Sequence, residues 1–279
     1  MSRNQDRLSG AQQHDTSPPP QQGGGGFSFV VPTEFVELPS QGKFYPQGHP
    51  LHGQESIEIR QMTAKEEDML TSRTLLKKGV ALDRVIASII VNKGIDPDSL
   101  LVGDRNAIII ATRVSGYGNI YETKVTCPNC GTNQEYSFDL NHANVYDGAD
   151  ARDLGVRLND DGTFNTTLPR TGVDVQFRLL NGRDEKSFMN GMQADKKSKS
   201  ERNITRQLAA IVVSLNGDSS MQAKQYFIDN VPSIDSRHLR LAYRLAAPNI
   251  DLTQHFECSE CSHEQDMEVP LSADFFWSN

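Results

Sequence analysis

The sequence has little that would mark it as a membrane protein or a secreted miniprotein. Its 279 residues include only four cysteines and one tryptophan, and hydrophobic residues make up 37 %. No apolar run is long enough to cross a bilayer, and the N-terminus lacks the continuous apolar stretch of a signal peptide. We therefore expect a soluble, intracellular protein without a membrane span, with enough residues for one large domain or two small ones.

Motifs of catalysis and nucleotide binding are also missing. The sequence contains no H-E-x-x-H, no P-loop, no G-x-S-x-G and no dinucleotide fingerprint. The glycine-rich stretch 115–119 follows a predicted helix, and the acidic run 66–68 fits a first helical turn, where carboxylates complement the helix dipole. We interpret the chain as non-enzymatic, with no catalytic residue and no small-molecule substrate.

Acidic residues outnumber basic ones, 36 to 28. Apolar side chains are scarce near the N-terminus. The net charge of −8 disfavours binding to nucleic acid through phosphate contacts. One basic cluster, residues 195–202, is either a solvated helix end or a binding patch, and the first is the commoner case. Residues 1–26 are rich in Gln, Pro and Gly, so we predict a disordered tail over residues 1–32.

The four cysteines form two C-x-x-C pairs, Cys127 with Cys130 and Cys258 with Cys261. Each pair lies at the tip of a predicted hairpin, which is the arrangement of a zinc knuckle. Two facing knuckles would supply four thiolates to one tetrahedral site, a zinc ribbon split between distant parts of the chain. Such a closed site leaves no position for water or substrate, so we expect the Zn²⁺ to be structural.

Three other uses of the cysteines compete with a shared zinc site. A redox C-x-x-C would lie between a strand and a helix N-terminus, which neither pair does. Two local disulfides would require an oxidising compartment. Two separate zinc sites would need further ligands, and only the second pair has histidines nearby, His255 and His263.

The sequence also matches itself at offsets of 118 to 131 residues, which predicts an internal duplication. Five blocks recur in the same order, and the extra residues at 45–55 and 218–227 are expected to be loops. The matching blocks are 36–42 with 166–172, 57–67 with 175–185, 87–91 with 209–213, 103–113 with 234–244, and the two C-x-x-C hairpins. The predicted fold is therefore α+β, with two tandem pseudo-symmetric repeats, residues 33–142 and 163–279, joined by a linker over 143–162.

Each repeat is expected to contain a short β element, about three helices and a C-terminal knuckled hairpin. In the first repeat, Thr63 and Glu66 form a capping-box pattern for a helix that runs to Gly79. A second helix should run from residue 82 to 93, and a third should start at the N-cap candidate Asp104.

The pattern over residues 35–140 resembles the T4-type phage baseplate hub proteins, a family described as baseplate hub assembly chaperones, and the C-terminal hairpin resembles it as well. The residues that carry the resemblance are Leu38, Pro39, Ser40, Gly42, Phe44, Tyr45, Pro46, Met62, Thr63, Glu66, Glu67, Gly103, Asp104, Arg105, Tyr117, Gly118, Tyr121, Cys127, Cys130 and Gly131. The resemblance implies a protein that organises hub subunits while a contractile tail assembles. It also implies other baseplate hub proteins as partners, in the host cytoplasm during assembly and then in the virion tail baseplate if the protein stays bound.

Two functions from other classes remain as alternatives. A zinc-ribbon adaptor for nucleic acid or the transcription machinery would need basic and aromatic residues around the knuckles. The hairpins carry eight acidic residues against Lys124, namely Glu122, Glu135, Asp139, Glu257, Glu260, Glu264, Asp266 and Glu268. A metal-dependent hydrolase would need an open coordination position, which four cysteine ligands remove.

Overall fold

The computed structural model describes residues 30–198, 202–269 and 275–276, without the side chains of 150 and 193–198. The chain divides into two units, Met1–Val31 and Pro32–Asn279, and every element below belongs to the second. The predicted tail and most of the basic cluster 195–202 lie outside the described residues and side chains. No helix in the described part of the chain is long and apolar enough to span a membrane.

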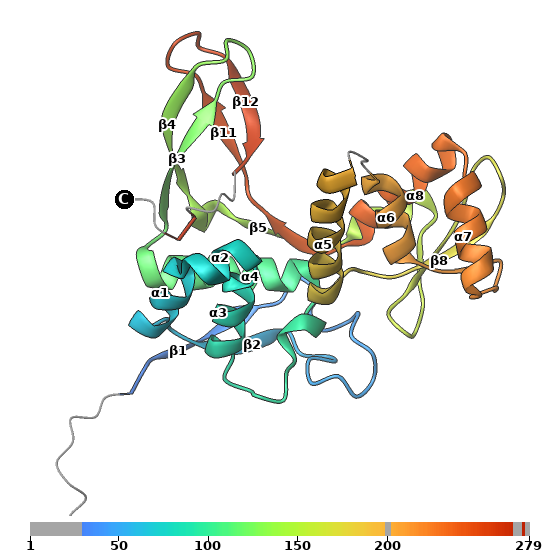
Figure 1. Cartoon of the computed structure of the whole chain (residues 1–279), viewed down its shortest axis with the longest axis horizontal. Helices are drawn as coiled ribbons and strands as arrows, with labels where there is room; N and C mark the ends of the chain where they lie inside the picture. Colours follow the sequence, from blue (N-terminus) through green and yellow to red (C-terminus); the bar gives the residue numbers. More distant parts are fainter. Residues whose placement is uncertain (1–29, 199–201, 270–274, 277–279) are drawn as a thin grey trace, which may run out of the picture. The chain divides into compact units, whose positions relative to one another are not determined.

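The first half of the second unit contains two short strands, a group of helices and a long hairpin (Figure 1). The strands pair antiparallel, with Val36 opposite Ile57, and the hairpin pairs Val125 with Gln134. The elements are β1 (Thr33–Glu37), β2 (Ser56–Arg60), α1 (Ala64–Thr71), α2 (Arg73–Lys78), α3 (Ala81–Ile89), the short η1 (Pro97–Ser99), α4 (Val102–Tyr117), β3 (Ile120–Thr126) and β4 (Asn133–Asp139).

The second half contains a four-stranded antiparallel sheet of order β6-β7-β8-β9, four helices and a second hairpin. Strand β10 leads from the last helix to this hairpin and pairs with β5. The elements are η2 (Leu140–His142), β5 (Asn144–Tyr146), η3 (Ala149–Leu154), β6 (Arg157–Leu158), β7 (Phe164–Thr167), β8 (Asp174–Phe177), α5 (Gly182–Ser198), α6 (Asn203–Ile211), β9 (Val212–Leu215), α7 (Met221–Asn230), α8 (Ser233–Ala246), β10 (Asn249–Asp251), β11 (Thr253–Glu257) and β12 (Glu264–Glu268).

The predicted first helix begins and ends where expected, but it is interrupted. Thr63 and Glu66 form the capping box, and Gly79 ends the segment with a left-handed φ of 68°. Ser72 takes an extended conformation between α1 and α2, and its hydroxyl accepts a hydrogen bond from the backbone N–H of Leu75. A serine that can cap a new helix therefore divides the segment in two.

Two other expectations are wrong, one because a tertiary contact ends a helix early and one because a local capping serine starts a helix where a loop was expected. Helix α3 ends at Ile89, since Ile90 leaves the helix to form a β-bridge with Ile59. The expected loop at 218–227 instead contains most of α7, which Ser220 caps through a hydrogen bond from Ala223.

Asp104 is not an N-cap, because α4 begins two residues earlier, at Val102. Its fully buried carboxylate instead accepts hydrogen bonds from the N–H and hydroxyl of Ser40 and from the hydroxyl of Tyr45, at 2.7–3.0 Å. Burial raises the pKa of Asp104, and these hydrogen bonds oppose the shift. Asp104 therefore fixes the turn after β1 to α4.

The buried apolar side chains form two clusters, and the second hairpin contributes to the first of them. The first cluster contains strands and helices of the first half together with Phe256, Cys258, Phe275 and Phe276 from the C-terminal end. The second cluster is built from residues 151–246, with Phe177, Leu208 and Leu239 at its centre. Residues at the C-terminal end of the chain therefore pack into the first cluster, although the residues before them form the second.

Ion pairs connect the two halves beside α4. The Arg105 guanidinium, with only 6 % of its side chain exposed, lies 2.8 Å from Asp83 and 3.0 Å from Glu185. Lys186 adds contacts of 3.2 Å to Asp83 and 2.6 Å to Asp98. Because Arg105 is nearly buried, its two carboxylate partners compensate the cost of removing its charge from water.

Candidate metal centre

The first C-x-x-C occupies the tip of the β3–β4 hairpin. The N–H of Cys127 donates to the carbonyl of Thr132, and the N–H of Gly131 donates back to the carbonyl of Cys127. Gly131 has a φ of 75°, a conformation that glycine adopts without strain. This tight turn directs both sulfur atoms to one side of the hairpin.

The second C-x-x-C, at the tip of the β11–β12 hairpin, repeats this geometry. The N–H of Cys258 donates to the carbonyl of His263, and the N–H of Ser262 donates to the carbonyl of Cys258. Ser262 takes the left-handed position with a φ of 51°. The two tips therefore share one backbone pattern, although a serine replaces the glycine in the second.

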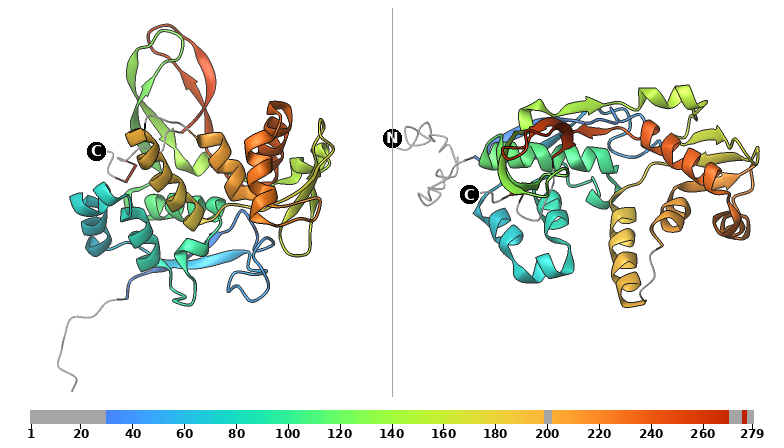
Figure 2. Two further views of the ribbon diagram at one scale, coloured as in Figure 1. Left: turned by 45° about the vertical axis from the view of Figure 1, so that its right-hand side comes forward. Right: turned by 90° about the horizontal axis from the view of Figure 1, so that it is seen from above.

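The two hairpins lie side by side (Figures 1 and 2), and polar side chains connect them. The amide of Gln134 donates to the carbonyl of Glu257 and accepts from the N–H of Ser259. The amide of Gln254 bonds in the same reciprocal way to the carbonyl and N–H of Asp139, at 2.8 and 3.2 Å. Each glutamine thus satisfies backbone groups of the opposite hairpin, as an added strand would.

An aromatic contact lies between the two glutamine contacts along the hairpins. The ring of Tyr136 packs against that of Phe256 with centroids 5.1 Å apart, and its hydroxyl donates to the carbonyl of His255. Phe256 is completely buried and belongs to the first core. Hairpin docking is therefore continuous with the hydrophobic core.

The docked hairpins bring all four cysteine sulfur atoms together, within 4.8 Å of one another. The Sγ atoms of Cys127 and Cys261 are 3.8 Å apart, and those of Cys130 and Cys258 are 3.7 Å apart. Cys127 and Cys258 are buried, whereas Cys130 and Cys261 face solvent. The four thiols lie close enough to bind one metal ion together.

Neighbouring polar groups favour ionised sulfur at this site. A hydrogen bond with the Thr132 hydroxyl, 3.4 Å from the sulfur, lowers the pKa of Cys130 to about 6. The side-chain amide of Asn129 points its N–H at the sulfur of Cys261 from 3.6 Å. A thiolate, and not a thiol, is the form that binds a metal ion.

The arrangement argues against the other uses of the cysteines. All four are free, so neither knuckle contains a local disulfide. Both pairs lie between two β-strands, and the redox motif would require a helix N-terminus. In the described part of the chain, neither His255 nor His263 joins a group of metal-binding side chains.

The sequence predicts the four cysteine ligands but not the glutamines that hold their hairpins together. Gln134 and Gln254 lie 115 residues or more from the backbone groups that they satisfy. Nothing in the local sequence distinguishes them from solvent-facing glutamines. Each lies on the same strand face as a buried phenylalanine, Phe138 in β4 and Phe256 in β11, but this position does not specify a partner.

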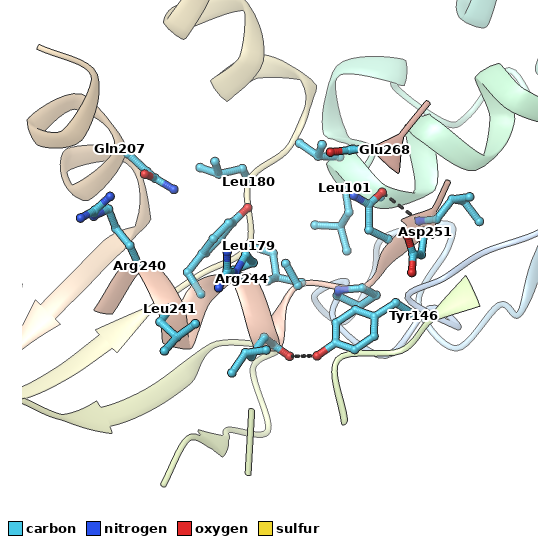
Figure 3. Close-up of a pocket in the computed structure, with 18 of the residues that line it drawn as sticks. Leu101, Tyr146, Leu179, Leu180, Gln207, Arg240, Leu241, Arg244, Asp251 and Glu268 are labelled. Carbon is cyan, nitrogen blue, oxygen red and sulfur yellow. Dashed lines mark hydrogen bonds between the residues drawn. The ribbon is translucent and has the colours of Figure 1, made fainter. Parts of the chain in front are cut away.

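A cavity of about 1080 Å³ lies away from the cysteines, between α8 and the strand that leads to the second hairpin. Figure 3 shows Arg240 and Arg244 on one side of it, with Asp251 and Glu268 on the other. The hydroxyl of Tyr146 donates to the carbonyl of Leu245 at 2.7 Å, and this hydrogen bond connects two of the residues that line the cavity. Cationic and anionic side chains thus face a shared opening from opposite sides.

Comparison with known proteins adds one finding to this geometry. No curated protein and no solved structure matches the chain. A protein family described as T4 bacteriophage base plate protein matches residues 31–277, which include both halves and both knuckled hairpins. Because the match covers nearly the whole chain, the protein belongs to the family of T4 bacteriophage base plate proteins.

Proposed function

We propose that the protein is a non-enzymatic component of phage tail assembly that organises baseplate hub subunits, as a hub assembly chaperone or a hub component. The observation that carries this proposal is the family match over residues 31–277, which supports a structural tail protein with other baseplate proteins as partners. The narrower role in the hub rests on the motif pattern that runs from Leu38 to Gly131. The proposed location is the host cytoplasm during assembly and the tail baseplate afterwards.

The proposed cofactor is one structural Zn²⁺ bound by Cys127, Cys130, Cys258 and Cys261. Four sulfur atoms at about 2.3 Å from a central ion lie about 3.8 Å from one another. Two of the six sulfur–sulfur separations, 3.7 and 3.8 Å, agree with that edge length, and all of them are within 4.8 Å. The role of the ion would be to fix the second hairpin against the first core, since each hairpin supplies two of the four ligands.

We also propose that the two halves are copies of one ancestral unit. In the first half, Arg60 forms a bidentate ion pair with Glu66 at 2.6 and 3.0 Å, just before α1. In the second half, Arg178 forms a bidentate pair with Asp184 at 2.7 and 2.8 Å, at the start of α5. Both pairs occupy matching positions in the aligned blocks, which supports a common origin.

A second matched contact involves the aspartates of α4 and α8. Asp104 accepts a hydrogen bond from the N–H of Ser40, in the Leu-Pro-x-x-Gly turn after β1. Asp235 accepts hydrogen bonds from the N–H groups of Arg170 and Thr171, in the equivalent turn after β7. Conserved geometry between two positions of one chain is stronger support for duplication than shared helix periodicity.

The alternative of a nucleic-acid adaptor has little support. The outward-facing residues of the docked hairpins include Glu122, Glu257, Glu264, Asp266 and Glu268, all of them exposed. Carboxylates in these positions would repel phosphate groups. We therefore expect protein partners and no binding to nucleic acid.

Co-purification during infection tests the proposed function. The tagged protein, produced from the phage genome, is recovered from infected cells, and bound proteins are identified by mass spectrometry. Recovery of baseplate hub proteins would support the proposal, and recovery of RNA polymerase or nucleic acid alone would contradict it. Recovery of wedge or tail-tube proteins without hub proteins would retain the family assignment but refute the hub role.

A further inference from the structure

The strand β1 has one edge that bonds to β2 and one edge without a described partner. Backbone hydrogen bonds from Leu38 to Glu55 and from Gln61 to Pro32 set the pattern of the pair. Because antiparallel strands direct alternate residues toward the partner, the odd-numbered Thr33, Phe35 and Glu37 turn their N–H and C=O groups away from β2. No backbone hydrogen bond to these three residues occurs in the described part of the chain.

The second half of the chain contains the same edge with a strand on it. In β7, Asn165 occupies the position that corresponds to Phe35, 130 residues earlier, and it likewise faces away from the neighbouring β8. Asn165 pairs with Arg157 of the short strand β6, which runs antiparallel beside it. The fold therefore has a place for one more strand on this edge, and the second half fills that place with its own chain.

The first half cannot fill the edge in the same way. The turn from β6 to β7 depends on Gly162, which has a φ of 80° and donates its N–H to the carbonyl of Asn159. The residue at the corresponding position before β1 is Pro32. Proline has a φ fixed near −65° and no N–H, so it can form neither feature of that turn. Pro32 therefore cannot form the turn that Gly162 forms before β7.

The side chains along β1 indicate what kind of segment would fit there. Phe35 is 72 % exposed, an unusual position for a phenylalanine on a sheet edge. On the same face, Glu37 follows two residues later and Glu58 of β2 lies directly opposite Phe35, so both place negative charge beside the ring. An added antiparallel strand with an apolar residue opposite Phe35 would cover the ring, and basic residues beside that position would complement the two carboxylates.

We propose that the outer edge of β1 binds an extended, basic segment of another baseplate protein by β-strand addition. The backbone groups of Thr33, Phe35 and Glu37 would provide the hydrogen bonds, and Phe35 would provide the apolar contact. This inference rests on the proposed assembly function and adds the surface through which one partner would bind. The strand β6, with Arg157 and Leu158, is the occupant of the equivalent edge within the same chain.

Photo-crosslinking during infection identifies the occupant. A benzophenone amino acid replaces Phe35 in the tagged protein, and a matched control places it at Tyr226, which is also 72 % exposed but lies on α7. The expected result is a crosslink from position 35, absent from position 226, to an extended basic segment of an identified baseplate protein. A crosslink to a second copy of the chain, to residues 1–29 of the same chain, or to nothing would overturn the inference.

A pair of substitutions at Phe35 separates backbone pairing from apolar contact. Phe35→Pro removes the outward N–H without touching the hydrogen bonds to β2, whereas Phe35→Ser removes the ring but keeps the N–H. These variants carry no crosslinker, and the partner identified by crosslinking is recovered with them by co-purification. We expect Phe35→Pro to reduce that recovery by about tenfold or more and Phe35→Ser to reduce it less. Equal recovery with the proline variant and the wild type would refute strand addition.

Two further readouts keep the outcomes distinct. Thermal unfolding and zinc content establish that both variants fold, which an edge-strand proline permits. If the wild type recovers hub proteins and Phe35→Pro recovers them equally, the proposed function stands and the β1 inference fails. If the wild type recovers no baseplate protein, the proposed function itself fails.

Discussion

Replacing Cys258 by serine would remove one of the four ligands of the proposed zinc site, which joins two hairpins that are distant in the sequence. Structural zinc in small Cys-containing sites contributes on the order of 10 kcal/mol, a value comparable to the total stability of a domain. After zinc loss, the remaining contacts between the hairpins are hydrogen bonds from Gln134, Tyr136 and Gln254, worth about 1 kcal/mol each, and the packing of the buried Phe256 against Tyr136, worth about 2 kcal/mol. Together these contacts are weaker than the expected zinc contribution, so the second hairpin should be held less firmly against the first core.

The expected size of the effect follows from this comparison. If about half of the zinc contribution is lost, the free energy of unfolding decreases by about 5 kcal/mol. For a unit of this size, 1 kcal/mol corresponds to about 2–4 °C in the unfolding midpoint, so Cys258→Ser should unfold at least about 10 °C lower. Thermal unfolding followed by circular dichroism, together with zinc content by mass spectrometry, measures both consequences.

The double variant decides whether the cysteines share a single ion. Cys127→Ser should lower the midpoint as much as Cys258→Ser, and the double variant should be little worse than either, because one substitution already destroys the site. Glu260→Gln, which changes an exposed residue between the second pair of cysteines, is the matched control and should bind one equivalent of zinc. Different single effects that add in the double variant would refute the shared site, as would two equivalents of zinc in the wild type.

Three more predictions concern the ion pairs, the buried turn contact and the tail. Burial alone would raise the pKa of Glu66, but hydrogen bonds from Arg60 and two hydroxyl groups lower it below its usual value. The ionised Glu66 carboxylate therefore stabilises the fold fully above a pH of about 4.5, and this contribution is lost as the pH falls further. Glu66→Gln should therefore lower the free energy of unfolding by about 2 kcal/mol at pH 7, and the difference from wild type in denaturant titrations should shrink below pH 4; a constant difference would contradict the ion pair. Asp104→Ala leaves three buried donors without an acceptor, among them the Tyr45 hydroxyl, and should cost about 3–5 kcal/mol in the same assay, whereas a cost under 1 kcal/mol would show that water replaces the carboxylate. Deletion of residues 1–26 should leave the unfolding midpoint nearly unchanged, because that segment has little apolar surface to bury, and a large decrease would mean that it packs on the folded unit.

Sequence signals that act over a few residues predicted the structure well. The capping box of Thr63 and Glu66, the left-handed Gly79 and the two C-x-x-C hairpin tips are all formed by neighbouring residues. Such contacts depend on the local backbone alone, so a pattern of residue types is sufficient to specify them.

Signals that depend on distant partners misled the sequence analysis or were absent from it. Asp104 looks like an N-cap, but its carboxylate is directed to Ser40, 64 residues earlier, by the packing of α4 against β1. Ile90 carries helical periodicity, yet a β-bridge to Ile59 ends its helix. The glutamines that dock the hairpins had no local signature. In each case, the deciding partner is chosen by tertiary packing, which a single sequence does not display.

The split cysteine site also constrains the order of events during synthesis. The sulfur atoms of Cys130 and Cys258 meet although 128 residues separate them in the chain. At about 5–20 residues per second, the first knuckle leaves the ribosome several seconds or more before the second exists. During that interval Cys127 and Cys130 could supply only two of the four ligands of the proposed zinc site, and a cysteine pair of a neighbouring nascent chain could supply the other two. Closely spaced ribosomes on one messenger RNA would therefore favour a zinc site shared between two chains. Zinc binding after synthesis is complete would favour a site within one chain.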